Sequence, residues 1–192
     1  MSVNLLDTIQ VSLQYPPLQK IDPNTQEVVV DNSKPDEHRF SQAAIPAVLT
    51  GLYKYSTIDE GADKLLSGDI STDWVSQAFG DTKNDVIEKV AAYSFQTKDE
   101  VLNKMNIIAQ TAVRLIHDNL NAGATKMDLK KFMAGQRGHF LPYLPEALHM
   151  GESLNDTTFD DNTNKMEGPI SSLMHKIGSA FSKPSDDAEL KQ

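Results

Sequence analysis

The chain of 192 residues lacks cysteine, and it also lacks a long uninterrupted apolar run. Without cysteine, disulfide bonds, thiol catalysis and cysteine-ligated zinc or iron–sulfur sites are excluded. A membrane-spanning helix needs about 18 or more consecutive apolar residues, and no segment approaches that length. Residues 1–10 carry neither the basic segment nor the apolar stretch of a secretory signal. We therefore expect a soluble, cytoplasmic protein without a transmembrane segment.

Basic charge is also scarce. The chain has 18 lysine and arginine residues against 27 acidic residues, which gives a net charge of −9 at pH 7. A negative surface repels the phosphates of nucleic acids, so we expect no general nucleic-acid binding. Most of the excess acid lies outside residues 36–150. Together with a hydrophobic content of 39%, this distribution predicts that part of the chain lies outside the folded core.

Recognisable catalytic motifs are absent as well. The sequence contains no G-x-S-x-G nucleophile elbow, no phosphate-binding loop and no dinucleotide-binding fingerprint. No two histidines have the i, i+3 or i, i+4 spacing of a helical metal site. The histidines are His38, His117, His139, His149 and His175. We therefore predict no catalytic residues, no metal ligands and no cofactor.

The dominant pattern that is present is helical periodicity. Apolar residues recur at steps of three and four, and glycines, prolines and N-terminal capping signals mark the boundaries. Helices are predicted at 2–14, 37–55, 58–67, 71–79, 83–95, 98–121 and 126–135, followed by a broken helical segment at 137–149. The helix at 98–121 carries the widest apolar stripe, so we expect it to be the central helix.

Threonine is expected to cap four of these helices. Thr57–Glu60 and Thr97–Glu100 have the form of capping boxes, in which the hydroxyl oxygen and the acid each accept from a free backbone N–H. Thr82–Asp85 and Thr125–Asp128 are variants with the shorter aspartate. Acids in the first helical turn are stabilised by the positive end of the helix dipole, and Asp59, Glu60, Asp99 and Glu100 are expected to lie there. We interpret these acids as structural rather than catalytic.

One segment departs from the helical pattern. Residues 22–24 read Asp-Pro-Asn, which is strong turn chemistry, and residues 28–30 are three valines. This combination predicts a small β-hairpin near residues 18–31, within an insertion that spans 18–35.

A weak internal repeat relates two parts of the chain. Residues 48–68 align without gaps with residues 115–135, so that Val48 meets Leu115 and Tyr53 meets Leu120. In both copies a long helix leads to a capped short helix that is expected to end at glycine, Gly68 or Gly135. The fold prediction is therefore an all-α multi-helix bundle built from two pseudo-repeated halves, with the hairpin insertion.

Short motifs between residues 4 and 145 resemble those of a known family. They are NLLD at 4–7, AIPAVLTG at 44–51, EGADKLL at 60–66, LKKFMAGQ at 129–136 and the Leu-Pro pair at 144–145. The chain is similar, over roughly residues 2–150, to the bacterial domain-of-unknown-function family 937, which is related to YidB-like proteins. The resemblance implies bacterial origin and an all-helical fold, and it implies no activity and no functional residues. Residues 18–35 depart from the family pattern.

A single basic cluster stands out against the acidic background. It consists of Lys126, Lys130, Lys131 and Arg137, with Asp128 as the acid among them. Positions 126 and 130 share a helical face. The functional interpretation is a patch for an anion or an acidic partner, and the alternative is a solvated helix face.

Beyond residue 150 the composition changes. We interpret 151–168 as an acidic flexible linker, 169–183 as an amphipathic helix that follows Pro169, and 184–192 as a disordered tail. The apolar face of this helix would be formed by Ile170, Leu173, Met174, Ile177 and Phe181. Because few basic residues flank it, docking on protein is favoured over docking on lipid, either on its own bundle or on a partner.

The leading functional hypothesis is a non-enzymatic bacterial protein that acts through protein–protein interaction, through self-association or as a structural element. The second hypothesis is a small-ligand binder or an enzyme with its site between the two helical halves, lined by His139, Arg137 and acids of the first half. The third is binding to an anionic surface through the basic cluster.

Overall fold

A computed structural model describes residues 3–22, 28, 35–69 and 73–160. Within these ranges the chain is helical and contains no strand, so the predicted α class is confirmed. The α-helices are α1 Leu5–Ser12, α2 Pro35–Thr57, α3 Asp59–Leu66, α4 Trp74–Phe79, α5 Lys83–Ser94, α6 Lys98–Asn119, α7 Lys126–Phe140 and α8 Met150–Ser153. Turns of 3₁₀ helix lie at Gly80–Thr82, Leu141–Tyr143, Glu146–Leu148 and Thr157–Phe159. None of the described helices combines the length and the apolar character needed to cross a bilayer.

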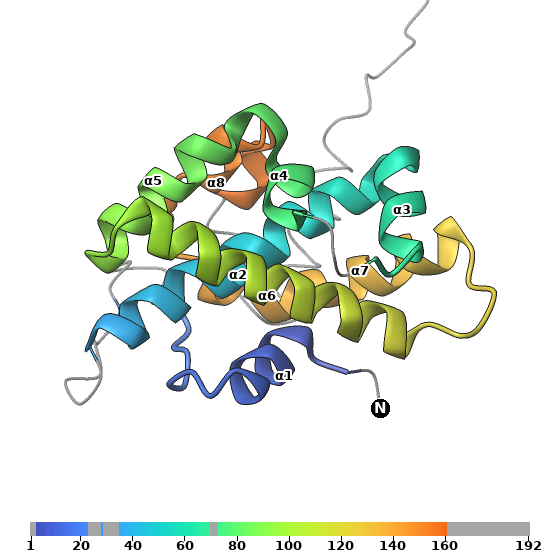
Figure 1. The fold of residues 1–192 in the computed structure, drawn as a ribbon, viewed down its shortest axis with the longest axis horizontal. Helices are drawn as coiled ribbons and strands as arrows, with labels where there is room; N and C mark the ends of the chain where they lie inside the picture. Colours follow the sequence, from blue (N-terminus) through green and yellow to red (C-terminus); the bar gives the residue numbers. More distant parts are fainter. Residues whose placement is uncertain (1–2, 23–27, 29–34, 70–72, 161–192) are drawn as a thin grey trace, which may run out of the picture.

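The centre of the bundle is α2. It packs against α1 and against each helix from α3 to α7, and Figure 1 shows α6 crossing in front of it. All residues from Phe40 to Leu52 are buried, so every face of this part of α2 is covered. The expectation that the 98–121 helix is central was therefore wrong, because α6 covers one side of α2.

Small side chains explain why α2 is so closely surrounded. Ala43, Ala44 and Ala47 lie in its buried stretch and are fully enclosed. At Gly51 an added Cβ would lie 2.5 Å from the ring of Phe79 in α4. Small residues carry little hydrophobic signal in a sequence, yet they allow neighbouring helices to approach closely.

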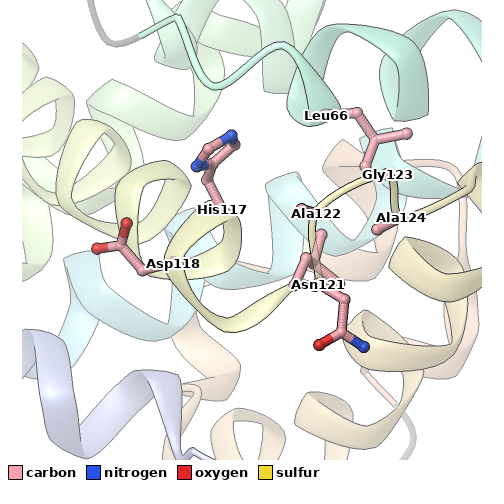
Figure 2. Close-up of a pocket in the computed structure, with 8 residues that line it drawn as sticks. Leu66, His117, Asp118, Asn121, Ala122, Gly123 and Ala124 are labelled. Carbon is pink, nitrogen blue, oxygen red and sulfur yellow. The ribbon is translucent and has the colours of Figure 1, made fainter.

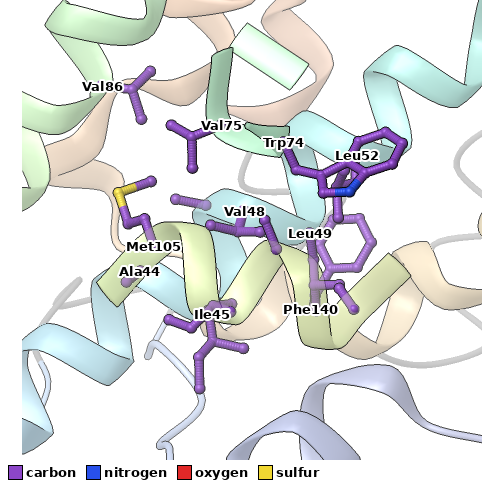
Figure 3. Packing of buried hydrophobic residues seen from close by; sticks show 14 of the residues in the cluster. Ala44, Ile45, Val48, Leu49, Leu52, Trp74, Val75, Val86, Met105 and Phe140 are labelled. Atoms are coloured by element: carbon purple, nitrogen blue, oxygen red, sulfur yellow. The ribbon is translucent and has the colours of Figure 1, made fainter. Parts of the chain in front are cut away.

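Large apolar side chains from the surrounding helices fill the core. Figure 3 shows Val48 and Leu49 of α2 among Trp74 of α4, Met105 of α6 and Phe140 of α7. All of these side chains are at most 1% exposed. Full burial stabilises each by about 1.5–3 kcal/mol, which accounts for the apolar positions without a functional role.

Two of the four predicted threonine caps are present. Thr97 and Glu100 form a capping box at α6, and Thr125 and Asp128 form one at α7. Thr57 instead lies in the last turn of α2 and donates to the carbonyl of Lys54, so α3 begins without a side-chain cap. Thr82 likewise donates to the carbonyl of Phe79. At both positions the hydroxyl is used by the preceding helical turn, because threonine can bond backward as well as forward.

The predicted hairpin receives no support. Leu18–Asp22 and Val28 have no strand structure, and residues 23–27 and 29–34 lie outside the described part. Backbone groups of Gln19 and Ile21 bond to the bundle instead of to a second strand. Ile21 N donates to the carbonyl of Pro142 at 2.8 Å, and Gln19 pairs with the side-chain amide of Gln42.

The pseudo-repeat stays a prediction, but the expectation that both short helices end at a glycine is wrong. In both copies a long helix is followed by a shorter one, α2 by α3 and α6 by α7. Gly68 ends the first copy with a positive φ of 65°. Gly135, however, lies inside α7, which continues to Phe140.

The folded region extends further toward the C-terminus than the sequence indicates. Residues 151–160, which were assigned to a flexible linker, form α8 and a 3₁₀ turn, and Phe159 is fully buried. Residues 161–168, the amphipathic helix at 169–183 and the tail at 184–192 lie outside the described residues.

Candidate functional site

The largest open cleft that we describe lies where α3 ends and the α6–α7 loop begins. Its volume is about 460 Å³. The lining residues are Leu66, His117, Asp118, Leu120, Asn121, Ala122, Gly123 and Ala124. Leu66 lies in the last turn of α3, and the other lining residues belong to the end of α6 and the loop that follows it. His139 and Arg137, which were expected to line a site between the two halves, do not line this cleft.

Gly68 lies close to His117, one of the residues that line this cleft. Its φ of +65° is a left-handed conformation that favours glycine. A Cβ at this position would lie 2.8 Å from Cδ2 of His117. The end of α3 therefore approaches the histidine ring more closely than another residue would allow.

The polar groups of the cleft do not converge. Figure 2 shows the imidazole of His117, the carboxylate of Asp118 and the amide of Asn121 pointing in different directions. General acid–base chemistry needs two groups within hydrogen-bond reach of the same substrate atom or of each other. The three side chains are exposed, and the arrangement offers no paired acid and base.

The basic cluster predicted from the sequence is largely paired with acids. Lys126 Nζ lies 2.8 Å from Asp63 Oδ2, and Lys130 Nζ lies 2.7 Å from Asp59 Oδ1. The hydrogen bond from Lys130 lowers the pKa of Asp59, and the hydrogen bond to Asp63 raises the pKa of Lys126. These two pairs connect α7 to α3, so both lysines have an intramolecular role.

The remaining two members of the cluster lie apart from these pairs. Lys131 is exposed and lines a shallow groove of about 290 Å³ with Phe132, Gly135 and Gln136. Arg137 donates to the carbonyl and hydroxyl oxygens of Thr158, at 3.4 and 3.2 Å. The four basic residues therefore serve different contacts and form no common anion pocket in this structure.

A cluster that the sequence did not indicate joins α5 to α8. Ser153 Oγ donates to Asp85 Oδ2 at 2.6 Å, and Lys89 Nζ lies 2.7 Å from the hydroxyl and 2.9 Å from the carboxylate. The hydrogen bond from Ser153 is the main reason that the pKa of Asp85 is lowered. The three groups are separated by up to 68 positions in the sequence, so no local sequence pattern could have predicted that they are in contact.

This cluster contains a serine and a lysine, yet its geometry is that of an ion pair bridged by a hydroxyl. An activated nucleophile needs a base that can take its proton and open space for a substrate. Ser153 is only 5% exposed, and its proton points to Asp85, which already holds Lys89. We interpret the cluster as the attachment of α8 to α5.

Among the described residues no group of histidine, aspartate and glutamate side chains is arranged to hold a metal ion. The chain matches none of the protein-family models, curated proteins and solved structures with which it was compared. The predicted partner face, Ile170 to Phe181, lies outside the described residues.

Proposed function

We infer that the protein is a non-enzymatic module that acts through protein–protein interaction, self-association or structural support. The observation that carries this inference is that the charged and buried polar side chains that we describe bond other parts of the same chain. Lysines 54, 89, 126 and 130 each pair with an acid of another element or turn, and the buried glutamines bond backbone groups. These side chains position helices, and the cleft at His117 lacks paired reactive groups.

The element proposed to engage a partner is the amphipathic segment at 169–183. Its apolar residues share one face at helical spacing, whereas Ser172 and Ser179 fall on the opposite face. A helix with one apolar face needs a complementary protein surface to cover that face. The resemblance to the domain-of-unknown-function family 937 fits a bacterial helical protein and remains a proposal, as do the cytoplasmic location and the two-half architecture.

The test uses two matched double variants of the full chain. Leu173→Asp with Ile177→Asp places two charges on the predicted apolar face, and Ser172→Asp with Ser179→Asp places the same charges opposite it. We expect the first pair to abolish self-association in sedimentation equilibrium, or capture of a bound protein, and the second pair to preserve it. Identical behaviour of both variants and the unaltered chain would remove this segment as an interaction element.

The cleft at His117 supports a second candidate, a small-ligand binder. Its position between the end of α3 and the α6–α7 loop, with exposed polar side chains on one side, supports this function. Titration of amino acids, nucleotides and sugar phosphates, followed by amide NMR shifts, should perturb residues 117–124 if the cleft binds one of them. His117→Gln should abolish the shifts. A panel that perturbs no residue in the cleft would argue against this function.

A further inference from the structure

Residues 150–160, which we call the C-terminal latch, are attached to three helices of the bundle. Its apolar contacts come from the buried side chains of Met150 and Phe159 and from Leu154, which packs against the core. The ring of Phe159 meets that of Tyr53 of α2 edge to face at 6.0 Å, and the guanidinium of Arg137 of α7 lies 6.0 Å from its centroid. Tyr53 in turn contacts Phe140, so the three aromatic rings are continuous.

Carboxylates provide the polar anchors of the latch. Asp156 Oδ2 lies 2.9 Å from Lys54 Nζ of α2, and its other oxygen accepts from the backbone and hydroxyl of Thr158. Asp85 of α5 accepts from Ser153. Inside the latch, Asp160 accepts from the backbone N–H groups of Gly151 and Glu152 at 2.8 and 3.1 Å.

Backbone hydrogen bonds described for this segment, by contrast, stay local. They run from Ser153 N to His149 O, from Asp156 N to Gly151 O and from Asp160 N to Thr157 O, among others of the same kind. Attachment to the bundle therefore depends on side chains. A short segment held by a few side-chain contacts can open at a much lower free energy than the core on which it rests.

We propose that the C-terminal latch is an acid-sensitive unit, which undocks from the bundle while the bundle itself stays folded. Protonation of Asp156 removes the attraction to Lys54, and protonation of Asp85 removes an acceptor from both Ser153 and Lys89. The charged groups that contact the latch are Lys54 from α2, Asp85 and Lys89 from α5, and Arg137 from α7. The latch adds Glu152, Asp156 and Asp160, and His149 precedes it.

The direction of the pH effect follows from the carboxylates. The pKa of Asp85 is lowered chiefly by Ser153; at Asp156 burial acts to raise the pKa, but hydrogen bonds from Lys54 and Thr158 more than offset it. A group with a lowered folded pKa stabilises the docked state above its unfolded pKa, and this stabilisation is lost as the pH falls through the folded value. Docking is therefore fully supported above about pH 5 and weakens below about pH 4.

Release of the latch has a consequence for the rest of the chain. Asp160 immediately precedes residues 161–192, so release of the latch also frees the point at which that segment is joined to the bundle. The proposal concerns the latch alone and stands or falls separately from the partner-binding role of 169–183.

Methionine methyl groups report the latch and the bundle separately. Met150 belongs to the latch and is 1% exposed, whereas Met105 and Met133 are fully buried in α6 and α7. With the full chain labelled at the methionine methyls, NMR spectra are recorded from pH 7 to pH 3. We expect the Met150 signal to move to its solvent-exposed position while Met105 and Met133 keep their native shifts. Simultaneous loss of all three native signals would overturn the proposal.

Two single substitutions test the role of the Asp156 carboxylate at constant pH. Asp156→Asn removes the attraction to Lys54, and we expect the released fraction to rise about three- to tenfold at pH 5. Glu152→Gln removes an equal charge from an exposed side chain of the same segment and should leave that fraction unchanged. Equal effects of both substitutions would show that the contact with Lys54 does not hold the latch, and would also overturn the proposal.

Discussion

The side-chain amide of Gln42 pairs with the backbone of Gln19 through two hydrogen bonds. Its oxygen accepts from Gln19 N and its nitrogen donates to Gln19 O, both at 2.9 Å. The same nitrogen donates to Tyr143 O at 2.8 Å. Gln42 is fully buried, so one side chain of α2 satisfies two segments that are distant in sequence.

Gln42→Ala should therefore destabilise the protein strongly. The change removes the three hydrogen bonds that the buried amide makes with Gln19 N, Gln19 O and Tyr143 O, and we expect a loss of about 2–3 kcal/mol in the free energy of unfolding. Urea denaturation followed by circular dichroism measures the loss. Gln77→Ala, which removes an exposed amide bonded only to the hydroxyl of Tyr55, should change stability by less than about 0.5 kcal/mol. Similar losses in both variants would contradict the role given to Gln42.

The two kinds of threonine should respond differently to alanine. Thr97→Ala removes the N-cap of α6, and we expect it to cost about 1 kcal/mol. Thr57→Ala removes only a bond back to Lys54 O and should cost well under half as much. Thermal unfolding of the two variants and of the unaltered chain measures both losses of stability. An equal loss at Thr57 would favour the capping box expected from the sequence.

Replacing a glycine of α7 and a glycine of α3 with alanine should change the free energy of unfolding in opposite directions. A Cβ at Gly135 meets no atom within 4 Å, so Gly135→Ala should stabilise α7 by about 0.5–1 kcal/mol. A Cβ at Gly61 would collide with the carbonyl oxygen of Tyr55, and Gly61→Ala should destabilise by about 1–3 kcal/mol. Chemical denaturation provides both values. A destabilised Gly135→Ala variant would indicate that the helix ends there, as the repeat predicts.

Anion binding by the basic cluster should increase when its acidic partners are neutralised. Asp59→Asn with Asp63→Asn frees Lys130 and Lys126, and we expect tighter binding to heparin with a salt dependence steeper by about one to two contacts. Asp81→Asn with Asp99→Asn changes the net charge equally without touching either lysine. If both double variants bind alike, net charge rather than release of the lysines controls the interaction.

Much of the helical architecture could be predicted, because periodicity and capping signals are local. The helices at 83–94 and 98–119 match their predicted ranges closely, and the capping boxes at Thr97 and Thr125 are present. The central position of α2 could not be predicted, since its alanines and glycine carry little hydrophobic signal. The prediction of caps at Thr57 and Thr82 was wrong because each hydroxyl donates to the backbone carbonyl three residues before it.

The candidate site was less accessible to sequence reasoning. The basic cluster was visible as four cations, but its pairing with Asp59 and Asp63 depends on how α3 packs on α7. The contacts of Asp85 with Ser153 and of Lys54 with Asp156 join residues far apart in the chain. Residues 151–160 look like a polar linker in the sequence because three of them are acidic and only Leu154 and Phe159 are large and apolar. In the structure two of these acids bond backbone groups and a lysine of α2, and Phe159 is fully buried.

A second buried glutamine, Gln136 of α7, accepts from Leu5 N and donates to Val3 O, both at 2.9 Å. These bonds join residues separated by 131 and 133 positions. During synthesis, α1 therefore leaves the ribosome long before its partner on α7 exists. The helix can pack on α2 earlier, but its bonds to Gln136 form only after α7 has been translated, so the docking of α1 is completed late in folding.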